Sequence, residues 1–423
     1  MSVTSTPPDF RLVQSSVDAF VGWLSRTGFA SHDPYDVWGT RYGLLARRLY
    51  YRKDPLGFAL TGPVIVMEML WPRLRMLFVR KERFATAHGQ LAMGFLNLHS
   101  ISGQPEPLET AMQLGGELHR LSIPGYSGHC WGYPFHWQNN SGLWKRNTPY
   151  ITATPYAYEA FARLHDATRD SAHSDLAVSA ARFVFLDLKD TPTSKKAAAA
   201  SYSPHDASKV VNASAYRAFV LFDAARRFGL DAYREKAWRN LHFILENQRE
   251  DGSWLYAVDN PAEKFIDHFH TCFVLKNLQK INLHLRDEAI RQAIHRGYAY
   301  YRRALFDAED LPVSFAIRPR TQLVRREMYD FAEAITLGCV LKDEVPGAFD
   351  LACRLAEKLC RDYQLPAGHF ITREYRLGLR HTMPYLRWPQ AQLFFALTNV
   401  LVAGGTQNRG EATLEADAGR SSS

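Results

Sequence analysis

The sequence predicts an all-α protein built as an (α/α)6 toroid, a closed ring of helical hairpins. Two observations predict this fold: a turn pattern that recurs at a fixed spacing, and an apolar helix that follows each turn. The clearest copies of the turn, Q-x3-G-x-W and Q-x3-G-x-F, are Gln248, Gly252 and Trp254, and then Gln364, Gly368 and Phe370. The second copy begins 116 residues after the first, which is two periods of about 58 residues. Because each hairpin contacts only its neighbours, such a ring can extend one core over 423 residues.

Two kinds of helix alternate between the turns. The inner helices are rich in small and apolar residues, and they are predicted to begin near Thr154, Asn212, His268, Glu327 and Arg387. The outer helices, such as residues 231–248 and 287–306, keep their charges on one face, which is typical of helices at a surface. Five such units are visible, and the atypical region 10–100 is predicted to supply a sixth hairpin.

A single toroid domain is therefore predicted over residues 1–404. Residues 405–423 are rich in Gly, Ser, Glu and Ala, and they predict a disordered tail. The apolar run from Leu56 to Trp71 contains Pro63 and Glu68 and is shorter than the ~20 residues that a membrane span needs. A buried helix is the favoured prediction for this run. Interfacial contact with anionic lipid is the alternative, because basic residues flank it.

The charge balance predicts an anionic partner. The formal net charge is +8 and the pI is near 9.1, values that suit nucleic acid, an anionic membrane or an acidic sugar. We expect no nucleic acid, because no nucleic-acid-binding motif is found. The five cysteines lack a CxxC spacing and predict reduced thiols. The polar start MSVTSTPPDFRL is unlike a signal peptide, so a cytoplasmic protein is expected, and no motif indicates a cofactor.

Polar and aromatic residues gather in the loops that precede the inner helices. In a ring these loops surround one mouth of the central funnel, where the helix N-termini favour anionic groups. The densest stretch is His129–Trp144, in which two histidines and several aromatic residues surround glycines and a proline. We interpret it as a wall that binds a sugar. The alternative is a plug that seals the ring between repeats.

Asp267, His268 and His270 form the most distinctive polar cluster before an inner helix. Residues i and i+2 do not share a helix face, and no second HxH or HExxH motif completes a metal site, so no metal is expected. Asp267 is instead predicted to cap the inner helix. One of the two histidines then points into the funnel, where it can act as an acid or base.

Two chemistries fit these loops, and the residues leave both open. Hydrolysis of a glycoside needs two carboxyl groups, for which the candidates are Asp36, Asp206, Asp251, Asp267, Asp330 and Glu333. An ion pair with Arg325 or Arg326 is the alternative role of Asp330 and Glu333. A uronate lyase or epimerase needs a His or Tyr base and groups that neutralise a carboxylate, for which the candidates are Arg41, Tyr133, His136, Asn212 and Arg387.

Two family resemblances extend this interpretation. The turn resembles the QW repeat of squalene-hopene cyclases and prenyltransferases, which also form α/α barrels, but their aspartate-rich motifs are absent. A second resemblance covers most of the chain and links it to VpsJ-like bacterial exopolysaccharide biosynthesis proteins, which resemble six-hairpin glycosidases. It is based, in order, on PYDVWGTRYG, CWGYPFHWQ, TPYITATPYAYEAF, HDASKVVNASAYRAF, NQREDGSWLYA and FIDHFHTCFVLKNL.

The second resemblance implies which residues occupy family motif positions. These are Asp36, Arg41, Trp131, Phe135, Trp137, Gln138, Asn212, Asp251, Trp254, Asp267 and His270, of which Asp251 and Trp254 would serve the repeat turn. With the loop analysis, we predict as catalytic Asp36, Tyr133, His136, Asp267 and His270. We predict as substrate-binding Arg41, Trp131, Trp137, Gln138, Asn212, Asp330, Arg387 and Trp388.

The sequence thus predicts a cytoplasmic, glycan-modifying protein of a surface-polysaccharide pathway, with peripheral contact to the inner membrane as an option. Its partner would be an oligosaccharide or a lipid-linked glycan bound in the funnel, and hydrolase, lyase and epimerase all stay open as its class. A non-catalytic glycan-binding or scaffolding subunit is the second hypothesis. An isoprenoid-handling enzyme, which would need an apolar funnel and an aspartate-rich metal site, is the third.

Overall fold

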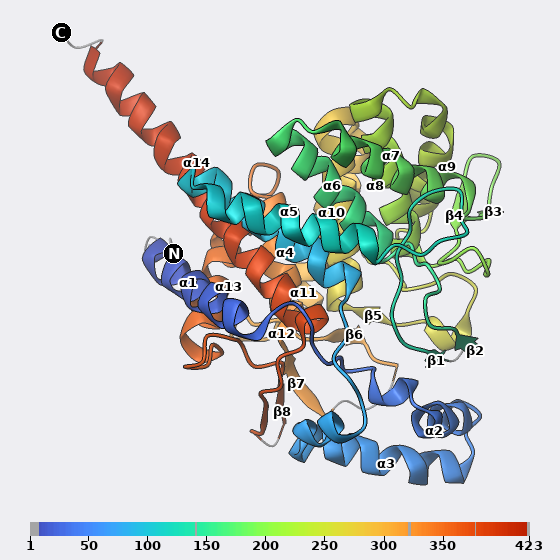
Figure 1. The fold of residues 1–423 in the computed structure, drawn as a ribbon. Coiled ribbons are helices and arrows are strands. Elements are labelled where there is room, and N and C mark those ends of the chain that lie inside the picture. The colour runs from blue at the N-terminus through green and yellow to red at the C-terminus, as the bar shows by residue number, and fades with distance from the viewer. Residues whose placement is uncertain (1–7, 140–141, 320–322, 377, 421–423) are drawn as a thin grey trace.

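The computed structural model describes residues 8–139, 142–319, 323–376 and 378–420 (Figure 1). Within this part of the chain, six inner helices form a closed ring in which each helix contacts the next and the last contacts the first. They are α4 (Ala85–Ser102), α6 (Thr154–Thr168), α8 (Val211–Phe228), α10 (His268–Leu285), α12 (Met328–Val340) and α14 (Ala391–Arg420). The predicted all-α toroid is therefore confirmed.

Outer helices cover the outside of this ring. They are α1 (Phe10–Thr27), α5 (Pro105–Arg120), α7 (Ser171–Leu186), α9 (Arg234–Glu246), α11 (Glu288–Ala304) and α13 (Ala348–Asp362). The inner helix α8 is buried at every residue from Val211 to Ala225, whereas α11 buries only one face, as expected for helices inside and outside a ring. The first helix, α1, contacts α13 and α14, so the two ends of the chain close the toroid together.

The recurring turn binds each outer helix to the next one. Gln248 follows α9, and its side-chain amide donates hydrogen bonds to the carbonyls of Gly252 at 3.0 Å and of Ala293 in α11 at 2.9 Å. Gly252 has a φ of 92°, and a Cβ there would lie 2.3 Å from the Arg296 carbonyl oxygen, so a larger residue would push α11 away. This close approach explains the glycine of the pattern.

The second copy of the turn closes the ring. Gln364 follows α13 and donates to the carbonyls of Gly368 at 2.9 Å and of Ser16 in α1 at 2.8 Å. Gly368 has a φ of 103°, and its Cβ would lie 2.2 Å from the Ala19 carbonyl oxygen. The helix at the start of the chain is thus held by the same device that joins the internal repeats.

A helical hairpin is inserted between α1 and α4. It consists of the 3-10 turn η1 (Val37–Gly39), α2 (Arg41–Tyr51), α3 (Pro55–Leu70) and the 3-10 segment η2 (Pro72–Leu77). Figure 1 shows α2 and α3 outside the ring, on the side that also carries β1, β2, β7 and β8. The run Leu56–Trp71, predicted as a buried helix, is α3, but Leu56 and Phe58 are more than half exposed. The prediction of burial is wrong because α3 packs mainly on α2 and η2, at the surface of the molecule.

Short antiparallel strands lie in the loops of the ring and pair either within one loop or between neighbouring loops. They are β1 (Trp137–Asn139) with β2 (Gly142–Trp144), β3 (Asp190–Pro192) with β4 (Ala198–Ala200), β5 (Ile266–Asp267) with β6 (Phe315–Ile317), and β7 (Val324–Glu327) with β8 (Arg373–Tyr375) and β9 (Arg380–His381). The β5–β6 pair ties the loop before α10 to the loop before α12, and β7–β8 ties the latter to the loop before α14. These pairings between loops stabilise the mouth of the ring.

The last helix, α14, extends past Gly405 to Arg420, into the segment that the sequence predicts as a disordered tail. Ala and Glu, which recur in this segment, are strong helix formers and can prolong a helix that has already begun. The final residues of that predicted tail, 421–423, lie outside the described residues. Among the described helices, none is long and apolar enough to cross a membrane.

Candidate functional site

A hydrogen-bonded Asp–His pair lies at the N-terminus of α10, at the mouth of the ring. Asp267 caps the helix, as predicted, by accepting a hydrogen bond from the His270 backbone N–H at 3.0 Å. Its second carboxylate oxygen lies 2.6 Å from Nδ1 of His270. Asp267 is 3% exposed and the His270 side chain 19%. A buried carboxylate at this position fixes the proton on Nδ1 and leaves Nε2 toward the mouth as an acceptor.

The second histidine of this segment has a structural role. His268 is fully buried, with Nδ1 3.2 Å from the Leu305 carbonyl and Nε2 2.8 Å from the Tyr301 hydroxyl. Burial lowers the pKa of His268 to about 3, so its imidazole is neutral at physiological pH. Of the two histidines, only His270 is placed for chemistry at the mouth.

A small cavity beside His270 contains an unsatisfied amide. Asn212, in the first turn of α8, lines this cavity with Tyr256, Asp267 and His270, and the rings of Tyr256 and His270 lie 4.6 Å apart. Asn212 is 1% exposed, yet neither its Nδ2 nor its Oδ1 has a hydrogen-bond partner among the described residues. Because a buried amide without partners is costly, Asn212 is suited to bind a hydroxyl or carboxylate that enters the cavity.

An open groove of about 380 Å³ adjoins this cavity and shares the ring of Tyr256 with it. Aromatic and polar side chains from the loops before α6, α8 and α10 form its walls. The main ones are Trp137, Trp144, Tyr202, Asp206, Lys209 and Asp259. Trp137 and Trp144 are register partners in the β1–β2 pair, so two indoles from the segment His129–Trp144 border one groove. Such walls offer apolar faces and hydrogen-bonding groups together.

A carboxyl group with an unusual environment lies in the first turn of α12. Asp330 is 1% exposed, and its Oδ2 accepts a hydrogen bond from the Ser314 hydroxyl at 2.6 Å. Its Oδ1 has no partner among the described residues. Burial, and then the neighbouring carboxyl groups of Glu327 and Asp267, raise the pKa of Asp330 well above its usual range. A carboxyl group kept protonated in this way can donate a proton.

An aromatic stack joins the segment before α14 to the first turns of α12 and α10. Trp388 lies flat on Tyr329, with 3.7 Å between ring centroids and 5° between planes. Phe269 meets both rings edge-on at 5.3 Å. Trp388 is partly exposed, and its contact with substrate stays a prediction.

Arg387 forms a buried ion pair, and its contact with substrate stays a prediction. Its Nε and Nη2 donate to the two carboxylate oxygens of Asp33 at 2.6 and 2.8 Å, and both residues are buried. The guanidinium carbon also lies 4.7 Å from the centre of the Tyr133 ring, which stacks on Phe135 at 5.5 Å. Tyr133, predicted as catalytic, is therefore part of an aromatic and cationic packing layer.

Asp36 is likewise occupied by structural partners. One oxygen accepts hydrogen bonds from Arg75 at 2.7 Å and from the Val37 backbone at 2.6 Å, and the other accepts from the Asp33 backbone at 3.0 Å. Arg75 also pairs with Glu68 of α3. These bonds fix the inserted hairpin to the mouth, and the catalytic role of Asp36 stays a prediction.

Four other predicted residues lie away from the Asp267–His270 pair. Trp131 is fully buried, and its Nε1 donates to the Leu118 carbonyl at 2.7 Å. Trp254 makes the same kind of bond to Ile244 at 2.9 Å, so Trp131 is a repeat-turn residue and has no face for a sugar. Arg41, the first residue of α2, and His136 are exposed, and Gln138 donates to the Asn139 carbonyl within β1. None of these contacts connects them to His270.

The remaining carboxylate candidates have partners of their own. Asp206 accepts five hydrogen bonds from backbone and hydroxyl groups of residues 202–208. Asp251 binds Ser253 in the repeat turn. Glu333 forms a buried ion pair with Lys276 and not with Arg325 or Arg326. Among the carboxyl groups considered for catalysis, Asp267 lines the cavity beside His270, and Asp330 keeps one oxygen without a partner among the described residues.

The sequence did not single out Tyr256 and Ser314. Tyr256 lies two residues after the repeat-turn tryptophan Trp254. A residue so close to Trp254 is expected to belong to the turn. Ser314 lies in a loop without a recognisable motif, and only the β5–β6 pairing brings it to Asp330. The signal that would have found them is their place just before an inner helix in the next repeat.

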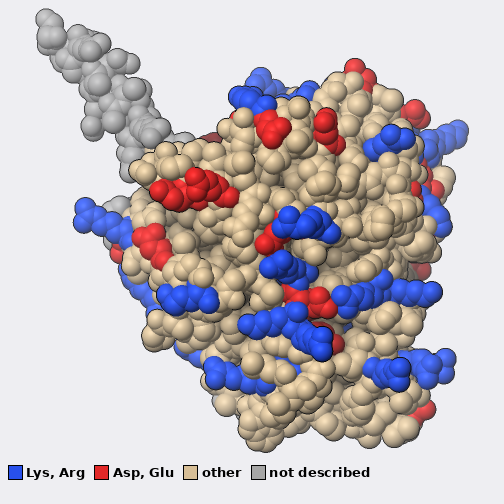
Figure 2. Space-filling model, in the orientation of Figure 1, with Lys and Arg blue, Asp and Glu red and all other residues tan. Residues whose placement is uncertain are grey.

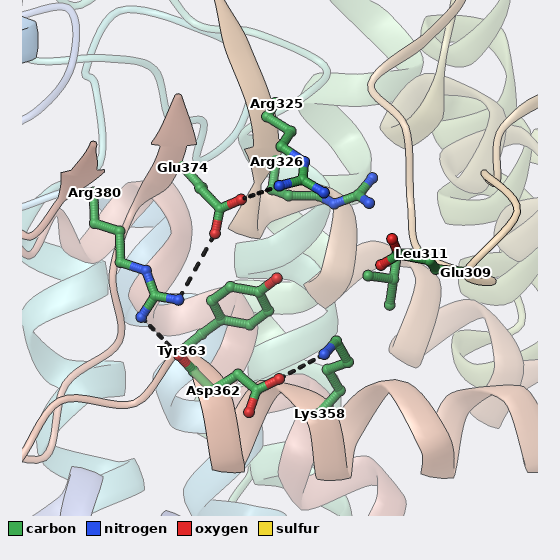
Figure 3. A pocket seen from close by; sticks show the side chains of 9 residues that line it. All are labelled: Glu309, Leu311, Arg325, Arg326, Lys358, Asp362, Tyr363, Glu374 and Arg380. Atoms are coloured by element: carbon green, nitrogen blue, oxygen red, sulfur yellow. Dashed lines mark hydrogen bonds and ion pairs between the residues drawn. The ribbon is translucent and has the colours of Figure 1, made fainter. Parts of the chain in front are cut away.

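A larger cavity on the outside of the ring is built differently. It has a volume of about 440 Å³ and is lined by residues of β7, β8 and α13 (Figure 3). Figure 3 shows Glu374 between Arg325 and Arg380, with N–O distances of 3.4 and 3.8 Å, and Lys358 beside Asp362 at 2.6 Å. Because these charges neutralise each other, the cavity resembles a solvated ion-pair network more than a site.

Comparisons with known proteins define the class of fold. No protein-family model matches the sequence, and no curated protein matches it. Solved structures do match. An unsaturated glucuronyl hydrolase specific for heparin has a TM-score of 0.63 and 10% identity, over 94% of this chain and 97% of its own. A cellobiose 2-epimerase from Bacillus thermoamylovorans has a TM-score of 0.58 and 10% identity, over 77% of this chain and 89% of its own.

A polysaccharide lyase is a third structure of this kind, with a TM-score of 0.53 and 13% identity, over 77% of this chain and 91% of its own. At such identities the likeness shows the fold and no more. The chain shares the α/α toroid fold of these structures. The finer resemblance to VpsJ-like proteins is not reflected in these matches and stays a prediction.

Proposed function

We propose that this protein is a glycan-modifying enzyme that transfers a proton at a sugar carbon, as a uronate lyase or epimerase does. The observation that supports this most is the Asp267–His270 pair, which lines a small cavity beside a groove with aromatic walls. His270 would remove the proton next to the uronate carboxylate. Asn212 would bind the sugar, and Trp137 and Trp144 would stack on neighbouring units. The structural matches, which include a hydrolase, an epimerase and a lyase acting on carbohydrates, support this class.

The reaction after proton removal can follow two courses. In an elimination, the electron pair left at C5 forms a C4–C5 double bond as the C4–O bond breaks, and an acid protonates the leaving oxygen. In an epimerisation, the carbon receives a proton on its opposite face. Asp330, with its raised pKa, is the proposed acid in either case.

Hydrolysis is the second candidate, and Asp330 is the observation that favours it. A protonated carboxyl group is the acid that a glycosidase needs at the leaving oxygen. The second group would then have to activate water, and His270 is the base placed for this. The cytoplasmic, surface-polysaccharide setting and a lipid-linked repeat unit as substrate belong to the proposal and rest on the resemblance to VpsJ-like proteins.

The test is an incubation with uronate-containing and neutral oligosaccharides in deuterated water, followed by mass spectrometry. Deuterium at C5 indicates epimerisation, a new 4,5-unsaturated end indicates elimination, and addition of water indicates hydrolysis. The variant His270→Gln should lower kcat by about 10²–10⁴-fold. The control His295→Gln, on outer helix α11, should keep the wild-type rate. Binding without any change across the panel would overturn the enzyme proposal and favour a non-catalytic glycan-binding subunit.

A further inference from the structure

One surface of the molecule collects most of its exposed apolar side chains. Among the described residues, 20 large hydrophobic side chains are exposed, and 12 of these lie between Tyr42 and Phe78. They are Tyr42, Leu45, Leu56, Phe58, Ile65, Val66, Leu70, Trp71, Leu74, Met76, Leu77 and Phe78. We call this surface, formed by α2, α3 and η2, the hairpin face. Scattered exposed hydrophobics are ordinary, whereas a contiguous concentration marks an interaction surface.

The same segment carries an excess of positive charge. Seven basic side chains are exposed and take part in no ion pair within the described residues, namely Arg41, Arg48, Arg52, Lys53, Arg73, Arg80 and Lys81. The acidic residues of the hairpin are engaged elsewhere: Asp54 caps α3, and Glu68 pairs with Arg75 and accepts from Tyr385 at 2.9 Å. Figure 2 shows Lys and Arg side chains above a lower edge that is mostly uncharged, with one acidic group at its right, where α3 lies in Figure 1.

The hairpin face is fixed to the ring. Arg75 is fully buried and bonds to Asp36 at 2.7 Å and to the Asp33 carbonyl. Glu68, on the inward side of α3, also lies 3.1 Å from Nε2 of His381 in β9. These contacts hold the inner side of α3, and its apolar outer side stays open. The exposed apolar surface therefore belongs to a helix that is held in place from its other side.

We propose that the hairpin face docks on an anionic lipid bilayer, with α3 lying in the plane of the membrane interface. A helix of 16 residues is about 24 Å long, too short to cross a bilayer core of about 30 Å. Apolar residues that enter the interface, together with a basic surround that attracts anionic headgroups, are the two components of such binding. The apolar residues alone would not select a charged membrane.

A second copy of the chain fits this surface less well. A twofold dimer through the hairpin face would place the same seven basic residues of both copies near each other, and Asp54 alone is too little acidic charge on the face to offset that repulsion. A membrane supplies both the apolar interior and the negative charge. Because α2 and α3 lie on the same side as the mouth of the ring (Figure 1), docking would also turn the groove toward the membrane. That the groove then acts on a lipid-linked glycan rests on the proposed function.

The test is co-flotation of the full chain with vesicles of phosphatidylcholine alone or of phosphatidylcholine with phosphatidylglycerol at 3:1. We expect binding to the anionic vesicles only, and weaker binding as salt is raised. The triple variant Phe58→Ser, Trp71→Ser and Leu77→Ser should lose at least ten-fold in affinity. Each change among Arg48→Gln, Arg52→Gln and Lys53→Gln should cost about five-fold, from about 1 kcal/mol per basic residue.

The matched control replaces exposed hydrophobics elsewhere, Leu186→Ser and Leu283→Ser, which are 51% and 56% exposed; it should bind vesicles like the wild type. Thermal unfolding followed by circular dichroism verifies that all variants are folded. Absence of binding to anionic vesicles overturns the proposal, and so does a dimer in analytical ultracentrifugation that the triple variant abolishes. Since the assay contains no glycan, its failure leaves the proposed catalytic function untouched, and the converse holds as well.

Discussion

At the mouth of the ring, some polar side chains have partners for their polar atoms and others do not. This difference separates residues that stabilise the fold from residues that are available for chemistry. The mouth contains matched pairs of one residue type: Asp33 and Asp330, His268 and His270, Trp131 and Trp137. The first member of each pair is buried with its polar atoms bonded. The second has an unpaired polar atom or borders a groove. Residue type alone therefore says little about function, and the state of each polar atom says more.

The largest expected effect comes from replacing Asp33, the carboxylate whose two oxygens both accept hydrogen bonds from Arg387. Asp33→Asn removes the charge opposite Arg387 while keeping the side-chain volume, so a buried guanidinium loses its counterion. We expect the free energy of unfolding to fall by about 3–5 kcal/mol, measured by urea denaturation at pH 7. A loss below 1 kcal/mol would show that Arg387 finds another partner, and the contrast with Asp330 would lose its basis.

The next prediction tests the burial of His268 through the pH dependence of the free energy of unfolding. The pKa of His268 is about 3 in the folded protein and about 6.5 when unfolded. Between these values the unfolded chain binds a proton that the folded protein does not, so stability is lost as the pH falls below about 6.5. The slope from this group approaches 1.4 kcal/mol per pH unit, or about 2 kcal/mol at pH 5. His268→Asn should flatten the stability profile between pH 4 and 6.5 by that amount, in urea titrations at several pH values.

Leu186→Ser is the control for that experiment. It changes a position that is 51% exposed and adds no ionisable group, so it should leave the slope between pH 4 and 6.5 steep. If both variants flatten the profile equally, the burial of His268 does not set the acid limb.

How much of this contrast the sequence could predict depends on the kind of interaction. Repeat and burial patterns follow from spacing, so the inner helices from Thr154 and His268 and the cap at Asp267 were predictable. The partners of Arg75 and Arg387 lie 39 and 354 residues away in the chain, and no local pattern reports such distances. For this reason Asp36 and Arg387 were predicted as functional, although both are neutralised.

The stretch His129–Trp144 shows the same limit within sixteen residues. Its richness in aromatic rings predicted a sugar-binding wall, with a plug between repeats as the alternative. The structure divides the stretch between the two roles: Trp131 seals a repeat turn, and Trp137 borders the groove. Composition could not divide it, because an indole has the same chemistry in a core and on a wall. Only the carbonyl of Leu118, 13 residues earlier, distinguishes them.

A smaller effect tests that division. Trp131→Phe removes the indole N–H bond to Leu118 and part of the buried ring. We expect a loss of about 1–2 kcal/mol in the free energy of unfolding. Trp137→Phe, at the half-exposed position, should cost less than half of that but should weaken glycan binding, measured by calorimetry. Equal losses of stability for the two variants would contradict the assignment of Trp131 to the turn.

The smallest expected change in stability is at Asp330, and it is the most informative. Because its folded-state pKa lies well above the usual 3.8, the folded protein keeps a proton that the unfolded chain releases, and stability falls as the pH rises above about 4. Asn resembles a protonated carboxyl group in shape, so Asp330→Asn should change stability at pH 4 by less than about 1 kcal/mol and should remove that decline toward pH 7. Asp33→Asn should do neither. If Asp330→Asn were as damaging as Asp33→Asn at both pH values, Asp330 would be an ionised structural residue, and the proton that we assign to it for catalysis would not exist.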